Sequence, residues 1–123
     1  MLDKRAYSRI DLSVPAILHD SRQNREISCQ VKNISETGVC FQIPLNERYI
    51  ENIKNNEYIH FQFIDTYMYG KSEETDVLST DCLIRYVKVD ENSMTIGGYV
   101  TEKGFQEYAS KREILYCIDK MYA

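Results

Sequence analysis

Hydrophobic and polar residues alternate along most of the chain, which is the pattern of β-strands with one buried face. Residues 27–31 read Ile, Ser, Cys, Gln, Val, and residues 59–63 read Ile, His, Phe, Gln, Phe. Other segments are rich in the β-branched and aromatic residues that strands favour. The pattern predicts six strands, which centre on residues 14–18, 27–31, 39–43, 58–63, 82–89 and 94–100.

Polar segments separate the predicted strands. Residues 20–24 and 90–93 have the length and composition of hairpin connections, and a longer polar stretch at residues 70–76 is expected to separate the fourth strand from the fifth. Gly97 and Gly98 interrupt the last strand and indicate either a bulge or the close approach of another backbone. Short strands that are joined mostly by hairpins predict a small antiparallel barrel or sandwich.

The alternation stops after residue 101, where helical spacing begins. Apolar residues then recur every three or four positions, so the sequence predicts a helix over residues 102–122 with one apolar face. This face consists of Phe105, Tyr108, Ala109, Ile114, Cys117, Ile118 and Met121. It is expected either to cover the barrel, which we favour, or to bind a partner. A further helical turn is expected within residues 44–56.

The length of 123 residues predicts one domain, with a flexible segment at 1–12, a barrel at 13–101 and the helix at 102–122. Hydrophobic residues make up 43% of the chain, which is typical of a globular protein. No apolar run approaches the about 20 residues that a bilayer span needs, and the polar start does not resemble a secretory signal. We therefore expect a cytoplasmic protein with no transmembrane segment.

The charge of the chain limits the partners that it can have. Its 15 basic and 19 acidic residues give a formal net charge of −4. An acidic protein repels a long polyanion, which argues against general binding of DNA or RNA. The first 32 residues nevertheless hold more basic than acidic side chains. This local positive charge suits a small anionic ligand.

Signatures of metal binding and catalysis are missing from the sequence. The two histidines are far apart, and no two cysteines have the close spacing of a zinc site. We expect all four cysteines to be small buried side chains: Cys29, Cys40, Cys82 and Cys117. No P-loop, dinucleotide fingerprint or nucleophile elbow occurs. The sequence thus predicts neither an enzyme nor a cofactor.

Two short elements carry the chemistry of a binding site. Arg5 and Arg9 precede the first strand, and their guanidinium groups can bind phosphate oxygens or the Hoogsteen edge of guanine. Asn33 and Ser35 follow at a strand end, where their side chains can hydrogen-bond to a polar ligand. Gly38 is expected to give the turn a positive φ and to leave room for the ligand beside the backbone.

Together these elements resemble the PilZ domain family, whose members are receptors for the bacterial second messenger cyclic di-GMP. The resemblance rests on Arg-x-x-x-Arg near the N-terminus and Asp/Asn-x-Ser-x-x-Gly in the second block, and it extends along essentially the whole chain. It implies a six-stranded antiparallel barrel with a C-terminal α-helix. It also implies that Arg5 and Arg9 bind the guanines and phosphates, with weaker contacts from Lys4. Asn33 and Ser35 would hydrogen-bond to guanine, and Gly38 would maintain the turn.

The resemblance predicts a sensor that makes and breaks no bond. The N-terminal segment, with few apolar residues, is expected to become ordered when its arginines bind cyclic di-GMP and so to signal to a downstream protein. Glu36 departs from the usual small residue and would weaken binding if it pointed at the ligand. The alternative is a PilZ-like module that binds a protein partner, or a second copy of itself, through the C-terminal helix.

Overall fold

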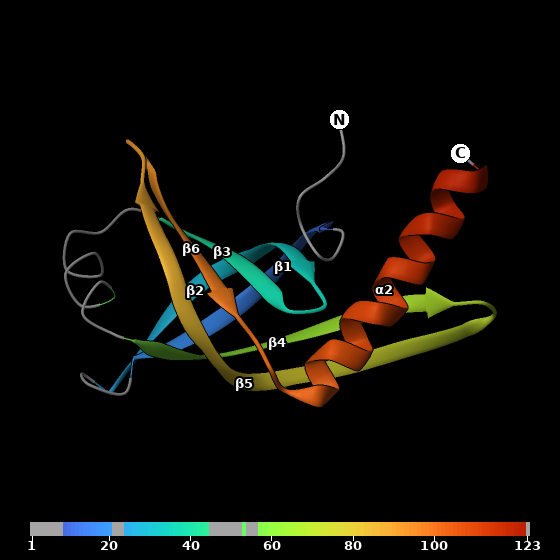
Figure 1. The fold of residues 1–123 in the computed structure, drawn as a ribbon, viewed down its shortest axis with the longest axis horizontal. Helices are drawn as coiled ribbons and strands as arrows, with labels where there is room; N and C mark the ends of the chain where they lie inside the picture. Colours follow the sequence, from blue (N-terminus) through green and yellow to red (C-terminus); the bar gives the residue numbers. More distant parts are fainter. Residues whose placement is uncertain (1–8, 21–23, 45–52, 54–56, 123) are drawn as a thin grey trace.

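The computed structural model describes residues 9–20, 24–44, 53 and 57–122 of the chain (Figure 1). These residues form six strands and one helix, with short turns between them. The elements are β1 (Ile10–Asp20), β2 (Arg25–Ser35), β3 (Gly38–Pro44), β4 (Tyr58–Tyr69), β5 (Ser72–Val89), β6 (Ser93–Tyr99) and α2 (Lys103–Tyr122). The helical turn that the sequence predicts within residues 44–56 falls almost wholly outside the described residues.

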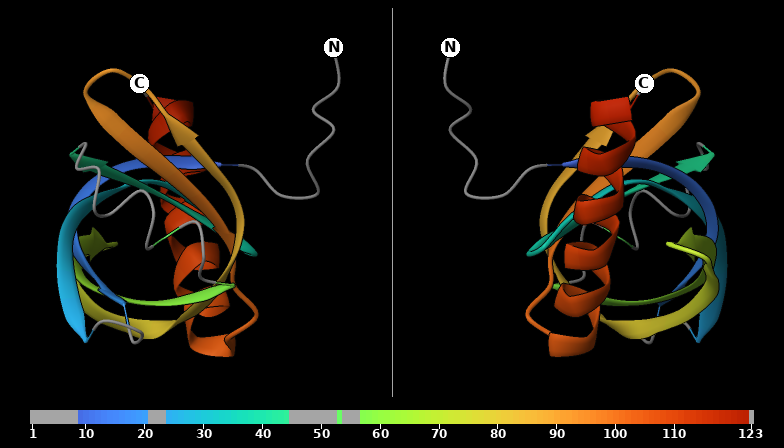
Figure 2. Two further views of the ribbon diagram at one scale, coloured as in Figure 1. Left: turned by 90° about the vertical axis from the view of Figure 1, so that its left-hand side faces the viewer. Right: turned by 90° about the vertical axis from the view of Figure 1, so that its right-hand side faces the viewer.

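The six strands form a closed barrel in the order β1-β2-β3-β6-β5-β4, and every neighbouring pair is antiparallel. Figure 2 shows the strands curving around a common interior, with α2 along one side. The predicted six-stranded antiparallel barrel with a C-terminal helix is therefore confirmed. Within the described residues, no helix is long and apolar enough to cross a membrane.

The alternating residues of the predicted strands form the core. Ile27 and Val31 are buried on β2, and Phe61 is fully buried on β4. The ring of Phe61 lies 5.2 Å from that of Phe41 and 5.9 Å from that of Phe105, measured between centroids. Aromatic pairs at such distances add to the free energy of burial. Phe105 belongs to α2, so the helix closes the barrel with the same aromatic cluster that fills it.

The polar stretch at residues 70–76 is not the long connection that the sequence predicted. Only Gly70 and Lys71 form the turn, and β5 begins at Ser72, so most of this stretch pairs with β4. Gly70 adopts a φ of 65°, which glycine tolerates and which a tight hairpin turn requires. The Thr66 and Thr75 hydroxyl oxygens lie 3.1 Å apart across the pair. The side chains that interact across this part of the β4–β5 pair are polar. The alternation of hydrophobic and polar residues therefore did not predict a strand here.

The helix is fixed at its start and along its first half. Glu102 caps it by accepting hydrogen bonds from the Gly104 and Phe105 amides, each at 2.8 Å. Tyr108 is buried and donates a hydrogen bond of 2.7 Å to the buried Asp65 carboxylate on β4. Burial and this bond raise the pKa of Tyr108. Nε of Arg112 lies 3.2 Å from the same carboxylate, in ion-pair contact but not aligned for a hydrogen bond.

The second half of the helix leaves its predicted apolar face exposed. Ile114, Ile118 and Met121 are 49%, 43% and 76% exposed, so the expectation that this face covers the barrel is wrong beyond Ala109. The contact side of α2 continues instead through Arg112 and the partly buried Leu115, which are separated from Tyr108 by whole helical turns. Ile114, Ile118 and Met121, which we call the α2 stripe, lie on an adjacent face.

The cysteines also divide into buried side chains in the barrel and an exposed side chain on α2. Cys29, Cys40 and Cys82 are buried in the barrel as predicted, and burial raises the pKa of Cys29 and Cys82 to about 12. Cys117 is exposed, which contradicts the prediction that all four are buried. Cys117 follows Tyr108 by nine residues, which at about 3.6 residues per turn places it on the side of α2 that faces away from the barrel.

Candidate functional site

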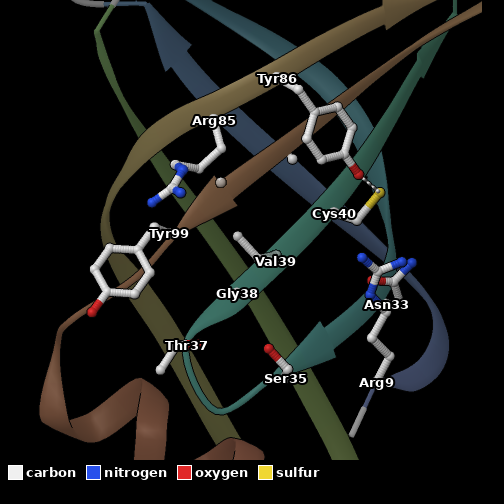
Figure 3. Close-up of a pocket in the computed structure, with 12 residues that line it drawn as sticks. Arg9, Asn33, Ser35, Thr37, Gly38, Val39, Cys40, Arg85, Tyr86 and Tyr99 are labelled. Carbon is white, nitrogen blue, oxygen red and sulfur yellow. Dashed lines mark hydrogen bonds between the residues drawn. The ribbon is translucent and has the colours of Figure 1, made fainter. Parts of the chain in front are cut away.

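A pocket of about 390 Å³ opens on the side of the barrel where β2, β3, β5 and β6 meet (Figure 3). Its lining residues come from the β2–β3 turn, from the middle of β5 and β6, and from the residue that precedes β1. They are Arg9, Asn33, Ser35, Thr37, Gly38, Val39, Cys40, Arg85, Tyr86, Gly97, Gly98 and Tyr99. None of these residues is acidic, and two are permanently cationic.

The β2–β3 turn forms one wall of the pocket. Ser35 ends β2 and pairs with Gly38 at the start of β3, so only Glu36 and Thr37 separate the strands. Gly38 does not have the positive φ that the sequence predicted. A Cβ atom there would lie 3.1 Å from Ser35 Oγ and 3.5 Å from the Gly98 carbonyl oxygen. The contact with Gly98 is an ordinary van der Waals distance, so the glycine chiefly leaves room for the Ser35 hydroxyl across the turn.

The predicted polar residues gather at one end of the pocket. Because Ile10 pairs with Ile34 and Asp11 with Asn33, Arg9 lies beside the end of β2. Figure 3 shows Arg9 and Asn33 together at this end, with Ser35 on the wall that leads away from them. Glu36 is not among the lining residues, so the anticipated negative charge does not line the pocket.

Tyr86 and the two glycines of β6 form the inner surface of the pocket. Ile84 pairs with Gly98 and Tyr86 with Gly97, so Arg85 is the extra residue of a bulge in β5. A Cβ atom on Gly97 would overlap the Tyr86 ring, which lies directly over this glycine. The bulge that the glycine pair suggested thus lies in the facing strand β5 and not in β6, and the group that approaches Gly97 is a side chain and not another backbone.

Tyr86 also connects the inner surface of the pocket to the end that holds Arg9. Its hydroxyl donates a weak hydrogen bond to Cys40 Sγ at 3.9 Å. Burial raises the pKa of Tyr86, Cys40 raises it further, and the positive charge of Arg9 opposes the change. The Arg9 charge thus acts inside the pocket even though its side chain is exposed.

Arg85 and Tyr99 form the other end of the pocket, and the sequence analysis missed both. The guanidinium carbon of Arg85 lies 6.0 Å from the centroid of the Tyr99 ring. Arg85 is the one cation within the apolar residues of 82–87, which was a signal that a polar site was near. Tyr99 offered no such signal, because an aromatic residue near the end of a strand is common.

The structure thus brings Arg9, Asn33, Ser35 and Gly38 to one pocket. Lys4 and Arg5 lie outside the described residues. The pocket offers cationic forks at both ends, an amide and hydroxyls on its walls, and exposed ring faces. These groups suit an anionic ligand that carries planar rings. Among the described residues, no group of His, Cys, Asp or Glu is arranged to hold a metal ion.

Comparison with known proteins gives one family. The profile described as PilZ domain matches residues 3–113. No curated protein sequence matches the chain.

Several solved structures share the fold. The structure of the Bacillus subtilis inhibitor of motility, MotI/DgrA, has 18% identity and a TM-score of 0.66, and the match covers 98% of this chain and 53% of that one. The K. pneumonia MrkH–c-di-GMP complex has 11% identity and a TM-score of 0.65, over 98% and 54% of the two chains. The PilZ domain of YcgR from Escherichia coli, solved with c-di-GMP, has 9% identity and a TM-score of 0.62, over 98% and 95%. The chain thus spans about half the length of the first two and nearly all of the third.

Proposed function

The chain belongs to the PilZ domain family, and from this premise we propose that its pocket is a receptor site for cyclic di-GMP. The family includes cyclic di-GMP receptors, and MrkH and the YcgR domain were both solved with this ligand. We further propose that the protein acts as a cytoplasmic sensor and not as an enzyme. Ligand binding then changes which surface a downstream protein meets.

The observation that carries the proposal is the meeting of Arg9 with Asn33, Ser35 and Gly38 at one pocket. These residues are distant in sequence, and the antiparallel register of β1, β2 and β3 brings them together. A planar guanidinium can bind two phosphate oxygens or two atoms of the guanine Hoogsteen edge. The Asn33 amide and the Ser35 hydroxyl can complete the hydrogen bonds of the base.

Titration calorimetry of the protein with cyclic di-GMP tests this proposal. We expect saturable heat with cyclic di-GMP and at least about tenfold weaker binding of cyclic di-AMP, because adenine presents an amino donor where guanine presents the O6 acceptor. GMP at the same concentration serves as the control for binding of a single nucleotide. If cyclic di-GMP produces no saturable heat, the proposal is wrong.

The N-terminal segment is the part that we propose to respond to the ligand. Arg9 lines the pocket, and Arg5 and Lys4 precede it in the sequence by only four and five residues, so we propose that they close over the phosphates of the bound ligand. We expect backbone amides of residues 1–9 to exchange with solvent more slowly after cyclic di-GMP is added, which hydrogen-exchange mass spectrometry measures. Amides at the β4–β5 turn are the internal control. Equal exchange of the N-terminal segment with and without ligand would contradict the ordering proposal.

The α2 stripe favours a second candidate function, that of an interaction module. Ile114, Ile118 and Met121 leave an apolar face exposed on α2, adjacent to the side that contacts the barrel. We propose this face as the contact for a downstream protein or for a second copy of the chain. The two candidates differ in the titration: a module that has lost ligand sensing keeps the stripe but gives no heat with cyclic di-GMP.

A further inference from the structure

The end of the pocket formed by Arg85 and Tyr99 has no part in the motif that suggested the ligand. Figure 3 shows these two side chains opposite the end that holds Arg9 and Asn33. Both are exposed, with Tyr99 at 39%, and neither is needed for the barrel core. A planar cation and an aromatic ring at the far end of a binding pocket can hold a second planar group.

The backbone beneath both side chains is held firmly. Tyr99 pairs with Gly38 on one side and with Leu83 on the other, so its Cα is fixed between two strands. The next residue, Val100, donates its amide to the Thr37 carbonyl at 2.9 Å. Arg85 is the extra residue of the β5 bulge, a feature that redirects a side chain out of the regular alternation. The two side chains thus project from fixed backbone positions, and their exposed ends contact each other.

The distance between the two groups is close to that of an open stacking slot. A planar base that stacks on both faces needs about 3.5 Å on each side, or about 7 Å in total. The Arg85 guanidinium carbon and the Tyr99 ring centroid are 6.0 Å apart, which is wider than direct stacking and about 1 Å short of that total. Because both side chains are exposed, a small rotation of either one opens the slot.

We propose that Arg85 and Tyr99 form a slot for a purine base of bound cyclic di-GMP, at the opposite end of the pocket from Arg9; this inference rests on the proposed function. The Tyr99 ring supplies one stacking face. Arg85 supplies the other face through its planar guanidinium, and its N–H groups at the edge of that plane can still donate to a phosphate oxygen of the ligand. Arg9 and the slot then bind the two bases from opposite ends, with the phosphates between two cations.

Variants of Tyr99 test the slot by calorimetry with cyclic di-GMP. Tyr99→Leu removes the ring and keeps an apolar side chain, so we expect affinity to fall at least about fivefold, the lower end of the effect of one base–aromatic stack. Tyr99→Phe keeps the ring and should bind within about twofold of the original chain. The exposure of Tyr99 makes both variants compatible with the fold, which a thermal melt verifies.

Arg85→Lys provides a second, independent variant. It keeps the positive charge but removes the planar face, so we expect it to weaken binding as Tyr99→Leu does. If Tyr99→Leu and Arg85→Lys bind like the original chain while Arg9→Ala has lost binding, the slot is wrong and the proposed function stands. If the original chain does not bind cyclic di-GMP, both are wrong.

The stoichiometry of the same titration identifies the molecule that supplies the base. One ligand per protein means that a single cyclic di-GMP spans the pocket from Arg9 to Tyr99. Two ligands per protein mean that the slot holds a base of a second, stacked molecule. In either case the slot is supported only if the Tyr99→Leu change weakens binding and the Tyr99→Phe change does not.

Discussion

Replacing Arg9 with alanine is expected to weaken the binding of cyclic di-GMP at least about thirtyfold while leaving the fold intact. Hydrogen bonds to charged groups contribute about 1.5–3 kcal/mol each, and about 2 kcal/mol corresponds to a thirtyfold change in affinity. Arg9 is exposed and directly precedes β1, so its side chain contributes nothing to the barrel core. Calorimetry measures the affinity, and a thermal melt shows that the variant remains folded.

Two further variants make the Arg9 result specific. Lys71→Ala removes the same positive charge at the exposed β4–β5 turn, outside the pocket, and should bind like the original chain. Arg9→Lys keeps the charge without the planar fork, so its affinity for cyclic di-GMP should lie between those of Arg9→Ala and Lys71→Ala. If Arg9→Ala binds as tightly as Lys71→Ala, then Arg9 does not hold the ligand.

Replacing Gly97 with alanine is expected to destabilise the barrel by about 1 kcal/mol, the low end of the cost of overpacking because the Tyr86 ring is 47% exposed, and to change the shape of the pocket. The new Cβ would overlap the Tyr86 ring. The β6 backbone cannot retreat, because Gly97 pairs with Cys40 on one side and with Tyr86 on the other. The Tyr86 ring must therefore move, and because it lines the pocket, its movement changes the surface that the ligand meets. Chemical denaturation measures the loss of stability, and calorimetry the loss of binding.

A double-mutant cycle shows whether the collision is the cause. Tyr86→Ala removes the ring and gives the new Cβ its space, so Gly97→Ala should cost little stability in that background. We expect the two changes to be non-additive by about 1 kcal/mol. A Gly97→Ala variant that is as stable as the original chain, or two changes that simply add, would contradict this account of the inner surface.

The strands of the barrel were predictable because each has one buried face. The alternation of Ile27, Cys29 and Val31 follows directly from the pleat, whichever strands pair with it. The ribbon at residues 72–76 was not predictable in this way, because polar side chains cover it on both faces and only pairing with β4 defines it. Likewise, the spacing of the α2 stripe indicates a helix face but not whether that face or the adjacent one with Arg112 and Leu115 contacts the barrel.

The candidate site was predictable in part. Arg9, Asn33, Ser35 and Gly38 belong to two short motifs, so their chemistry could be read before their positions were known. Gly38 was correctly placed at the turn, where it lines the pocket, but it does not have the positive φ that was predicted.

Residues far from those two motifs complete the pocket. Arg85 and Tyr99 reach it only through the β5 bulge and the closure of β6 against β3 and β5. No sequence motif predicts how β6 pairs with β3 and β5, so these two residues could not be assigned to the pocket from the sequence.

Nuclear magnetic resonance of the ¹⁵N-labelled protein shows directly where cyclic di-GMP binds. If the pocket between Arg9 and Tyr99 holds the ligand, the backbone amide signals of Gly38, Arg85, Gly97 and Gly98 will shift progressively during the titration, and those of the α2 stripe will change less. If the pocket signals stay in place while those of the outer barrel face around Ile17, Ile64 and Val77 shift, the ligand binds elsewhere and the proposed site is wrong.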